Sequence, residues 1–247
     1  MSDSTFKTRS TLFEFTKCSK CQYDNTPYQS ICENCKAYLR EKIVNIDLWV
    51  TIQKLIESPF EAFRTIVYAE HKNFIFFLLV FISIKNLIIA RFISIPELGK
   101  EGVTTSLVFL FLLSVLITIS FIFIISFIQS KIFQKLNIKL RAIDVMALNS
   151  YSQIPLIFSL VLIFPVEMIV LGGDLFSNNP FSFQIKPVIT YILIFFEIVM
   201  VVWSFLLYYF SIQFAGISKV YCFVSALIVF VMWSLVQFIS SKVIFTL

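Results

Sequence analysis

The sequence has 247 residues, of which 58% are hydrophobic and 14% charged, and its formal net charge is +5. Soluble domains contain about 45–50% apolar and about 25% charged residues, so this composition excludes a typical soluble enzyme or nucleic-acid-binding domain. The charges are uneven, because 19 lie in residues 1–72 and 16 in residues 73–247. We therefore predict an all-α polytopic membrane protein with a polar N-terminal head.

Residues 1–15 lack both a continuous apolar stretch and a small-residue cleavage site, so we expect a disordered N-terminus and no cleaved signal peptide. Two Cys-x2-Cys pairs follow, separated by ten residues: Cys18, Cys21, Cys32 and Cys35. Each pair can bring two sulfurs to one metal, and four thiolates complete a tetrahedral zinc site. About 20 residues cannot fold on apolar burial alone, so we predict a ribbon over residues 16–42 with Zn²⁺ as a structural cofactor.

Other uses of these cysteines remain open. Two disulfides would require an oxidising compartment, a redox Cys-x-x-Cys would need only one pair, and an iron–sulfur centre also uses four thiolates. A site closed by four cysteines leaves no open position for catalysis, so we expect no enzymatic metal centre. The fifth cysteine, Cys222, falls inside the last apolar run, where we expect it to pack as a small residue.

The cysteine segment, residues 18–39, resembles the short zinc ribbons that head many bacterial membrane proteins. Those ribbons usually carry glycine after each second cysteine, where the turn favours a positive φ. Gln22 and Lys36 occupy these two positions here.

Residues 46–72 are predicted to form two juxtamembrane helices. The first, 46–57, places apolar residues at helical spacing, with Trp49 at headgroup depth if the helix lies on the membrane surface; packing against the ribbon or the membrane body is the equal alternative. In the second, about 59–70, Ser58 and Glu61 fit a capping box and Pro59 the first helical position. The apolar face of this second helix is predicted to be Ala62, Phe63, Ile66 and Val67.

Five apolar runs are each long enough to cross a hydrocarbon core of about 30 Å. They cover about 73–95, 104–128, 146–171, 188–211 and 220–241, within a membrane domain of residues 73–247. Lysine and arginine concentrate in the head and in the segment 129–145, which the positive-inside rule assigns to the cytoplasm. Five spans then place the C-terminus outside, and we expect the bacterial inner membrane.

Two segments carry a second resemblance. Residues 55–66, LIESPFEAFRTI, precede the first span, and Tyr151-Ser152-Gln153-Ile154-Pro155 lies in the third. With five spans following, residues 50–245 resemble the bacterial branch of the Yip family, whose eukaryotic members interact with Rab GTPases. The resemblance implies a five-helix layout with the N-terminus inside and the C-terminus outside, and a role in membrane organisation.

Four ionisable residues fall inside the predicted spans, at two matched depths. Lys85 and Glu197 lie near the middle of spans one and four, and Arg91 and Glu167 lie toward the outer ends of spans one and three. Such charges are costly in lipid and mark functional sites by default. They are either static ion pairs, part of an ion or substrate path, or side chains that reach water independently.

The third predicted span has the most polar surface, with Asn149, Tyr151 and Gln153 in its inner half. Pro155 and Pro165 should kink it or free backbone carbonyls there. A cavity lined by this span is one interpretation, and ordinary packing is the other.

These observations favour a non-enzymatic scaffold whose cytoplasmic ribbon docks a protein partner while the spans contact the lipid bilayer. The alternative is a transporter that uses Lys85, Glu197 and the polar surface of the third span. A membrane-embedded enzyme has no motif in its favour, and we expect no nucleic-acid partner. The pattern is compatible with an oligomer.

Overall fold

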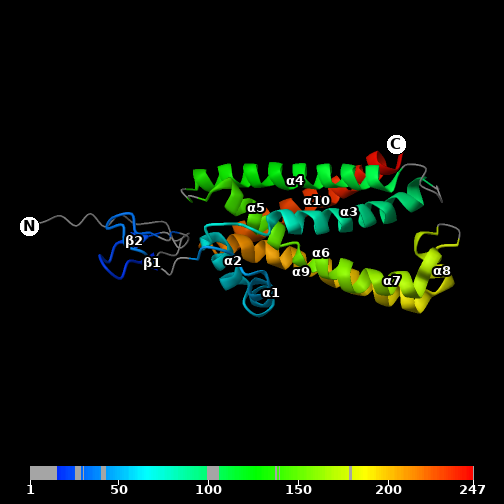
Figure 1. Cartoon of the computed structure of the whole chain (residues 1–247), viewed down its shortest axis with the longest axis horizontal. Coiled ribbons are helices and arrows are strands. Elements are labelled where there is room, and N and C mark those ends of the chain that lie inside the picture. Colours follow the sequence, from blue (N-terminus) through cyan, green and yellow to red (C-terminus); the bar gives the residue numbers. More distant parts are fainter. Residues whose placement is uncertain are drawn as a thin grey trace, which may run out of the picture.

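The computed structural model describes residues 16–25, 29, 31–39, 43–98, 106–136, 138, 140–177 and 180–246. The segment expected to be disordered, residues 1–15, lies outside them. The ribbon contains a two-stranded antiparallel sheet, β1 (Thr16–Lys17) and β2 (Asp24–Asn25). It lies at one end of an elongated helical bundle, and the C-terminal end of the last helix lies at the other (Figure 1). An odd number of crossings produces this arrangement.

The first juxtamembrane helix, α1 (Leu48–Glu57), begins at Asp47, whose Oδ1 accepts a hydrogen bond of 3.0 Å from the Val50 N–H. Thr51 and Leu55 are buried, and α1 packs against the next helix. This face of α1 is therefore buried against the second juxtamembrane helix, a contact that neither of the two sequence-based alternatives specified. Trp49 lies on another face and is 78% exposed, so it remains available to lipid headgroups.

The second helix, α2 (Pro59–Tyr68), buries the four residues predicted to face inward, Ala62, Phe63, Ile66 and Val67. The predicted capping box is wrong. A capping box needs the N–H of Ser58, but that N–H already donates to the Lys54 carbonyl at 2.8 Å, because only one residue separates the two helices. The Glu61 carboxylate accepts a 2.9 Å hydrogen bond from Arg64 Nη1 instead.

Among the described residues, five helical segments are long and apolar enough to cross a membrane, as predicted. They are built from α3 (Ile75–Leu98), α4 (Leu107–Lys135), a composite third span, α9 (Pro187–Gln213) and α10 (Lys219–Thr246). A short helix, α8 (Ser182–Ile185), precedes α9. The second span continues to Lys135, past its predicted end near 128, because helical hydrogen bonding does not stop where the apolar run stops.

The third span is interrupted as its prolines predicted. Helix α5 (Ala142–Tyr151) ends at a turn, and the span then comprises α6 (Ile154–Phe158), a π-helix η1 (Ser159–Ile163), α7 (Phe164–Leu171) and a 3₁₀ turn η2 (Gly172–Phe176). Pro155 and Pro165 each sit in the first turn of a new helical segment, where a missing N–H costs nothing. The predicted start at 146 is therefore wrong, because α5 is a separate helix.

The spans pack in two groups. Helix α3 contacts α4 and α10, while α9 packs against α6 and also contacts α10 (Figure 1). The main apolar core lies at the ribbon-proximal end, where α2 and α5 meet the spans, and it includes Phe63, Ile82, Tyr151 and Leu207. Large apolar side chains cover the outer faces of α4, α9 and α10. Such surfaces belong in lipid, so the chain is an integral membrane protein.

Candidate functional site

The two cysteine pairs form two knuckles with the same backbone geometry. In each knuckle, the first cysteine donates its N–H to a carbonyl five residues later and accepts at its own carbonyl from the residue four later. The bonds are Cys18 N to Tyr23 O (3.0 Å), Gln22 N to Cys18 O (2.9 Å), Cys32 N to Ala37 O (2.9 Å) and Lys36 N to Cys32 O (3.1 Å). The repeated pattern explains why the two pairs can face each other across one centre.

Gln22 and Lys36 adopt the left-handed conformation that the resemblance to glycine-bearing ribbons implied. Their φ angles are 57° and 58°, and they are the only non-glycine residues with positive φ among those described. A left-handed conformation costs an L-residue about 1–2 kcal/mol. Each knuckle therefore carries backbone strain that the closed cysteine cluster must offset.

The four sulfurs converge on one point. Cys18 Sγ lies 3.6 Å from Cys35 Sγ, and Cys21 Sγ lies 3.5 Å from Cys32 Sγ. All four lie within 4.8 Å of one another, and every cysteine is a free thiol. A tetrahedral metal with sulfur ligands at about 2.3 Å has sulfur–sulfur edges of about 3.8 Å, so the cluster could hold one metal ion. The disulfide alternative is not the one the structure adopts.

Backbone groups around Cys18 favour the thiolate form that a metal binds. The N–H groups of Cys21 and Lys20 lower the pKa of the Cys18 thiol below its usual value, and the Lys20 N–H lies 3.4 Å from Cys18 Sγ. Asn25 is buried beside the cluster. Its Nδ2 donates to the Tyr23 carbonyl at 2.8 Å and lies 3.6 Å from Cys32 Sγ.

Asn25 also accepts at Oδ1 from the Glu33 N–H at 3.0 Å, so it links the first knuckle to the second. The sequence did not single out this residue. An asparagine in a turn-rich segment is common for local backbone reasons, and nothing in its spacing indicated a contact with sulfur.

The ribbon is joined to the membrane domain by a short pairing of two extended segments, 43–46 and 70–73. The Glu70 and His71 N–H groups donate to the carbonyls of Ile43 and Val44, both at 3.0 Å. Asn73 then accepts from the Ile46 N–H at 3.2 Å and donates back to its carbonyl at 3.3 Å. The chain leaving the ribbon is thus held directly against the start of α3.

Lys72 anchors the same region. Its Nζ donates to the carbonyls of Ile66 (2.6 Å), Val67 (2.9 Å) and Ala69 at the C-terminal end of α2. It also forms an ion pair with Asp144 of α5. The sequence treated Lys72 only as a basic residue flanking the first span.

In the membrane domain, Lys85 and Glu197 contact each other as their matched depths predicted. Lys85 Nζ lies 2.8 and 2.9 Å from the two oxygens of Glu197, and Ser159 Oγ donates to Glu197 Oε1 at 2.5 Å. The side chains of Lys85 and Glu197 are 3% and 22% exposed. This contact ties α3, η1 and α9 together.

Arg91 and Glu167 do not pair with each other in the described structure. The Arg91 guanidinium lies over the ring of Phe245 in α10, 5.4 Å from its centroid, and its Nη1 lies 3.5 Å from Ser94 Oγ. It is therefore directed toward α10, whereas Glu167 lies on α7. Glu167 Oε2 is buried and has no hydrogen-bond partner among the described residues. Matched depth alone did not predict the contacts of these two residues.

The polar residues of the third predicted span are buried and used mainly in helix packing. Asn149 donates to Ser126 Oγ at 2.9 Å and to Gln129 Oε1 at 2.8 Å, which joins α5 to α4. Gln153 Nε2 donates to the Tyr208 hydroxyl at 2.8 Å. Tyr151 is fully buried, and Pro155 begins the continuation of the helix. The packing interpretation fits these contacts.

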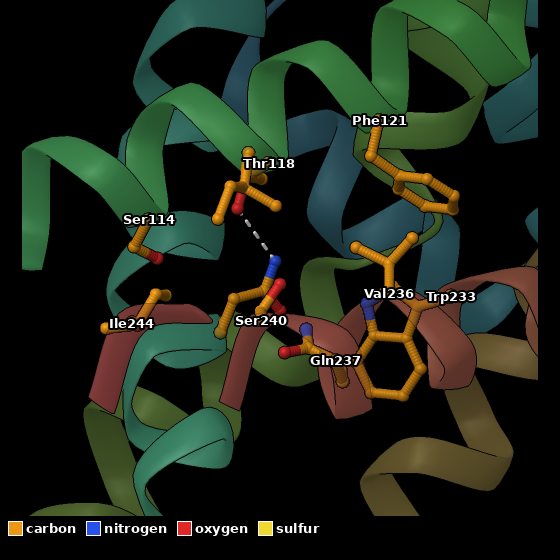
Figure 2. A pocket seen from close by; sticks show the side chains of 10 residues that line it. Ser114, Thr118, Phe121, Trp233, Val236, Gln237, Ser240 and Ile244 are labelled. Atoms are coloured by element: carbon orange, nitrogen blue, oxygen red, sulfur yellow. Dashed lines mark hydrogen bonds between the residues drawn. The ribbon is translucent and has the colours of Figure 1, made fainter. Parts of the chain in front are cut away.

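Two small cavities of about 10 Å³ each and a larger one of about 130 Å³ between α4 and α10 lie in the described part of the bundle. Figure 2 shows the first, between α4 and α10, where Asn86 Nδ2 donates to Thr118 Oγ1 at 3.1 Å. Asn86 Oδ1 and Trp233 Nε1 have no partner among the described residues, and a cavity of this size is just large enough for one water. Lys85 and Glu197 line none of these cavities.

No family model, curated protein or solved structure matches this chain. Its function must therefore be argued from its own residues. Those residues define an integral membrane protein of five apolar helices with a four-cysteine cluster, consistent with a small zinc-binding ribbon, that could hold a metal ion.

Proposed function

We propose that the protein is an integral membrane scaffold whose ribbon binds one structural Zn²⁺ and docks a protein partner at the cytoplasmic face of the bacterial inner membrane. The observation that carries the proposal is the closed four-sulfur cluster. The segment that follows the ribbon, 43–46, is hydrogen-bonded to residues 70–73, immediately before α3. A site with four protein ligands has no position for substrate, so its role is structural.

Zinc fits the cluster better than the other metals that bind proteins. Sulfur-only tetrahedral sites select zinc or iron, and zinc ribbons are built from two Cys-x2-Cys knuckles. A ribbon of this size has little apolar core, so metal binding would supply most of its folding free energy. The ribbon should therefore fold only when its metal is bound.

The ribbon offers a candidate contact surface. Ile31 and Tyr38 face each other across an isolated antiparallel bridge, and they are 44% and 60% exposed. Tyr23 is also exposed. Exposed aromatic and aliphatic side chains on a small polar module are typical of protein contact sites.

The basic residues in the N-terminal head and in the segment between the second and third spans support a cytoplasmic N-terminus. The Yip-like segments support the same layout, and we extend the proposal to membership of the bacterial branch of that family. A reporter enzyme that is active only outside the cytoplasm should be active when it is fused after residue 247. A reporter active in the cytoplasm would contradict the orientation.

The zinc test is the metal content of the purified protein. We expect one zinc per chain, and its loss in a Cys18→Ser/Cys35→Ser variant. Less than about half an equivalent in the unaltered protein would contradict the proposal.

Partner docking is tested by photo-cross-linking in native membranes from position 38, with position 20 of the same ribbon as the matched control. A discrete cross-linked product from position 38 alone, which disappears in the double cysteine variant, is the expected result. Products of equal yield from both positions, or none from either, would contradict a docking role.

A transporter is the second candidate, and the buried Lys85–Glu197 pair next to a π-helix is the observation in its favour. The cavities weigh against it, because two are only water-sized and the larger one, of about 130 Å³, is lined mainly by apolar side chains and by neither Lys85 nor Glu197. A Ser159→Cys variant that reacts with a membrane-impermeant thiol reagent would favour the transporter, and a protected cysteine would favour the scaffold.

A further inference from the structure

Glu167 is the one buried carboxylate of the membrane domain whose charge the described contacts leave unmatched. It lies on α7 with 5% of its surface exposed, and its Oε2 accepts no hydrogen bond from the described residues. If the carboxylate is ionised, this oxygen loses its hydration without gaining a donor, which is costly in a low-dielectric interior.

The neighbouring Glu197 shows what a satisfied carboxylate looks like in the same bundle. Both its oxygens accept hydrogen bonds from the Lys85 ammonium, at 2.8 and 2.9 Å, and one also accepts a hydrogen bond from the Ser159 hydroxyl. Lys85 and Glu197 are the two charged groups that act electrostatically on Glu167. One ammonium cannot neutralise two carboxylates, and the Lys85 ammonium is already bound by the Glu197 carboxylate.

Other charged groups on surrounding elements do not supply a positive charge to Glu167. They are Arg91 of α3, which contacts Ser94 and Phe245, Asp174 of η2, which is a further negative charge, and Lys186, which donates to the Val170 carbonyl at 2.7 Å. The Lys85, Glu197 and Glu167 cluster therefore has a net charge of −1 if both carboxylates are ionised. A low-dielectric interior strongly disfavours that state.

The backbone next to this cluster is also unusual. Ser159 opens the π-helix η1, and Glu167 lies on α7 immediately after it. Single π-helical turns within longer helices occur frequently at functional sites. Here the π-turn carries the hydroxyl that binds Glu197 and precedes the helix that presents Glu167.

We propose that Glu167 is a proton-binding site of the membrane domain, holding one proton on its carboxyl group while Glu197 remains ionised against Lys85. Binding forms one O–H bond on the carboxylate, with the proton taken from water, and neutralises the cluster. A metal cation is the poorer ligand, because it needs several oxygen donors and Oε2 has no polar neighbour within hydrogen-bond distance among the described residues.

The proposal goes beyond the scaffold role, because it assigns a chemical state to the spans that does not depend on the ribbon or its metal. Loss of the proton would place two negative carboxylates on neighbouring helices, α7 and α9. Their repulsion would loosen this contact, so the packing of the third and fourth spans depends on pH.

Infrared difference spectroscopy of the full-length protein in lipid vesicles tests this directly, because a protonated carboxyl group has a carbonyl stretching band separate from those of carboxylates. At neutral pH we expect one such band that shifts in D₂O. It should disappear in Glu167→Gln and persist in Glu61→Gln, which removes an exposed carboxylate outside the spans.

Lys85→Met provides a second, independent arm that does not remove Glu167. Without its ammonium, Glu197 should also take up a proton, so the band should approximately double. Raising the pH of the unaltered protein should remove the original band, which keeps the test valid if Glu167→Gln fails to fold.

Three results would overturn the proposal. They are the absence of the band from the unaltered protein at neutral pH, its persistence in a folded Glu167→Gln variant, and its loss when Na⁺ or K⁺ is added at constant pH. The last would show that the site takes a metal cation in place of a proton.

Discussion

Lys72 Nζ lies 3.2 Å from Asp144 Oδ1, and the two side chains are 2% and 6% exposed. The same ammonium binds three carbonyls at the C-terminal end of α2, where a positive charge is favoured by the helix dipole. Asp144 in turn accepts from Arg141 Nε and Nη2, at 3.0 and 2.9 Å. A single buried lysine thus joins the end of α2 to the beginning of α5.

Replacing this lysine should be strongly destabilising. In Lys72→Met, the α2 carbonyls lose their donor and Asp144 keeps only its partner Arg141. Removing one member of a buried ion pair costs about 3–5 kcal/mol. Thermal unfolding of the purified protein in detergent should show this as a clearly lowered midpoint.

The control for Lys72→Met is Arg141→Met, because Lys72 and Arg141 both bind the carboxylate of Asp144. The Arg141 side chain is exposed, so its loss should cost no more than about 1 kcal/mol. Equal losses in the two variants would show that burial does not set the strength of this cluster.

Asn25→Ala should weaken metal binding without removing a ligand. The amide orients both knuckles and lies beside Cys32 Sγ, and loss of such a supporting contact lowers metal affinity about 10- to 100-fold. Competition with a chromophoric chelator measures the change. Gln29→Ala, which removes an exposed amide that donates to the Glu33 carboxylate, should leave the affinity unchanged. A matching loss in both variants would contradict the role of Asn25.

Glycine should improve each knuckle. Gln22→Gly and Lys36→Gly relieve the left-handed strain at φ 57° and 58°, and the gain should exceed the entropic cost of glycine by about 0.5–1 kcal/mol per site. The zinc-loaded protein should then lose its metal at a higher temperature. Lys20→Gly, at a position without positive φ, should have no such benefit. Destabilisation at positions 22 and 36 would mean that these side chains make contacts that outweigh the strain.

The Lys85–Glu197 pair can be measured with a double-mutant cycle. Lys85→Met leaves the Glu197 carboxyl group buried without its partner, and Glu197→Met does the same to the Lys85 ammonium, so each should destabilise the protein more than the double variant does. We expect a coupling free energy of about 1–3 kcal/mol from unfolding in detergent. A double variant no better folded than the worse single variant would argue against a direct interaction.

The sequence predicted the features that local chemistry determines. Apolar runs set the number of spans, because every backbone polar group in lipid must be bonded within a helix. Cysteine spacing set the ribbon, and Pro155 and Pro165 marked the interruptions of the third span. The inward face of α2 followed from helical periodicity alone.

Long-range contacts were harder to predict. Lys72 binds carbonyls of α2 and a carboxylate 72 residues later in the chain, and neither partner is visible in its local pattern. Depth matching predicted the Lys85–Glu197 contact, but depth alone does not determine toward which neighbouring helix a side chain points. Arg91 lies at an appropriate depth for Glu167 but contacts a ring in α10. The predicted capping box at Ser58 was wrong because Ser58 lies between two helices and its N–H already bonds the first of them.

The pairing of segments 43–46 and 70–73 has a mechanical consequence. The two segments run parallel, with an isolated bridge between Asn45 and His71, and they close the chain from 47 to 69 into a loop. A partner pulling on the ribbon would apply force to segment 43–46 at its N-terminal end, while α3 holds segment 70–73 at its C-terminal end. This is a shear geometry, in which the hydrogen bonds share the load instead of opening one at a time. Tension would therefore be transmitted to α3, while α1 and α2 lie within the loop, bear no force and stay folded.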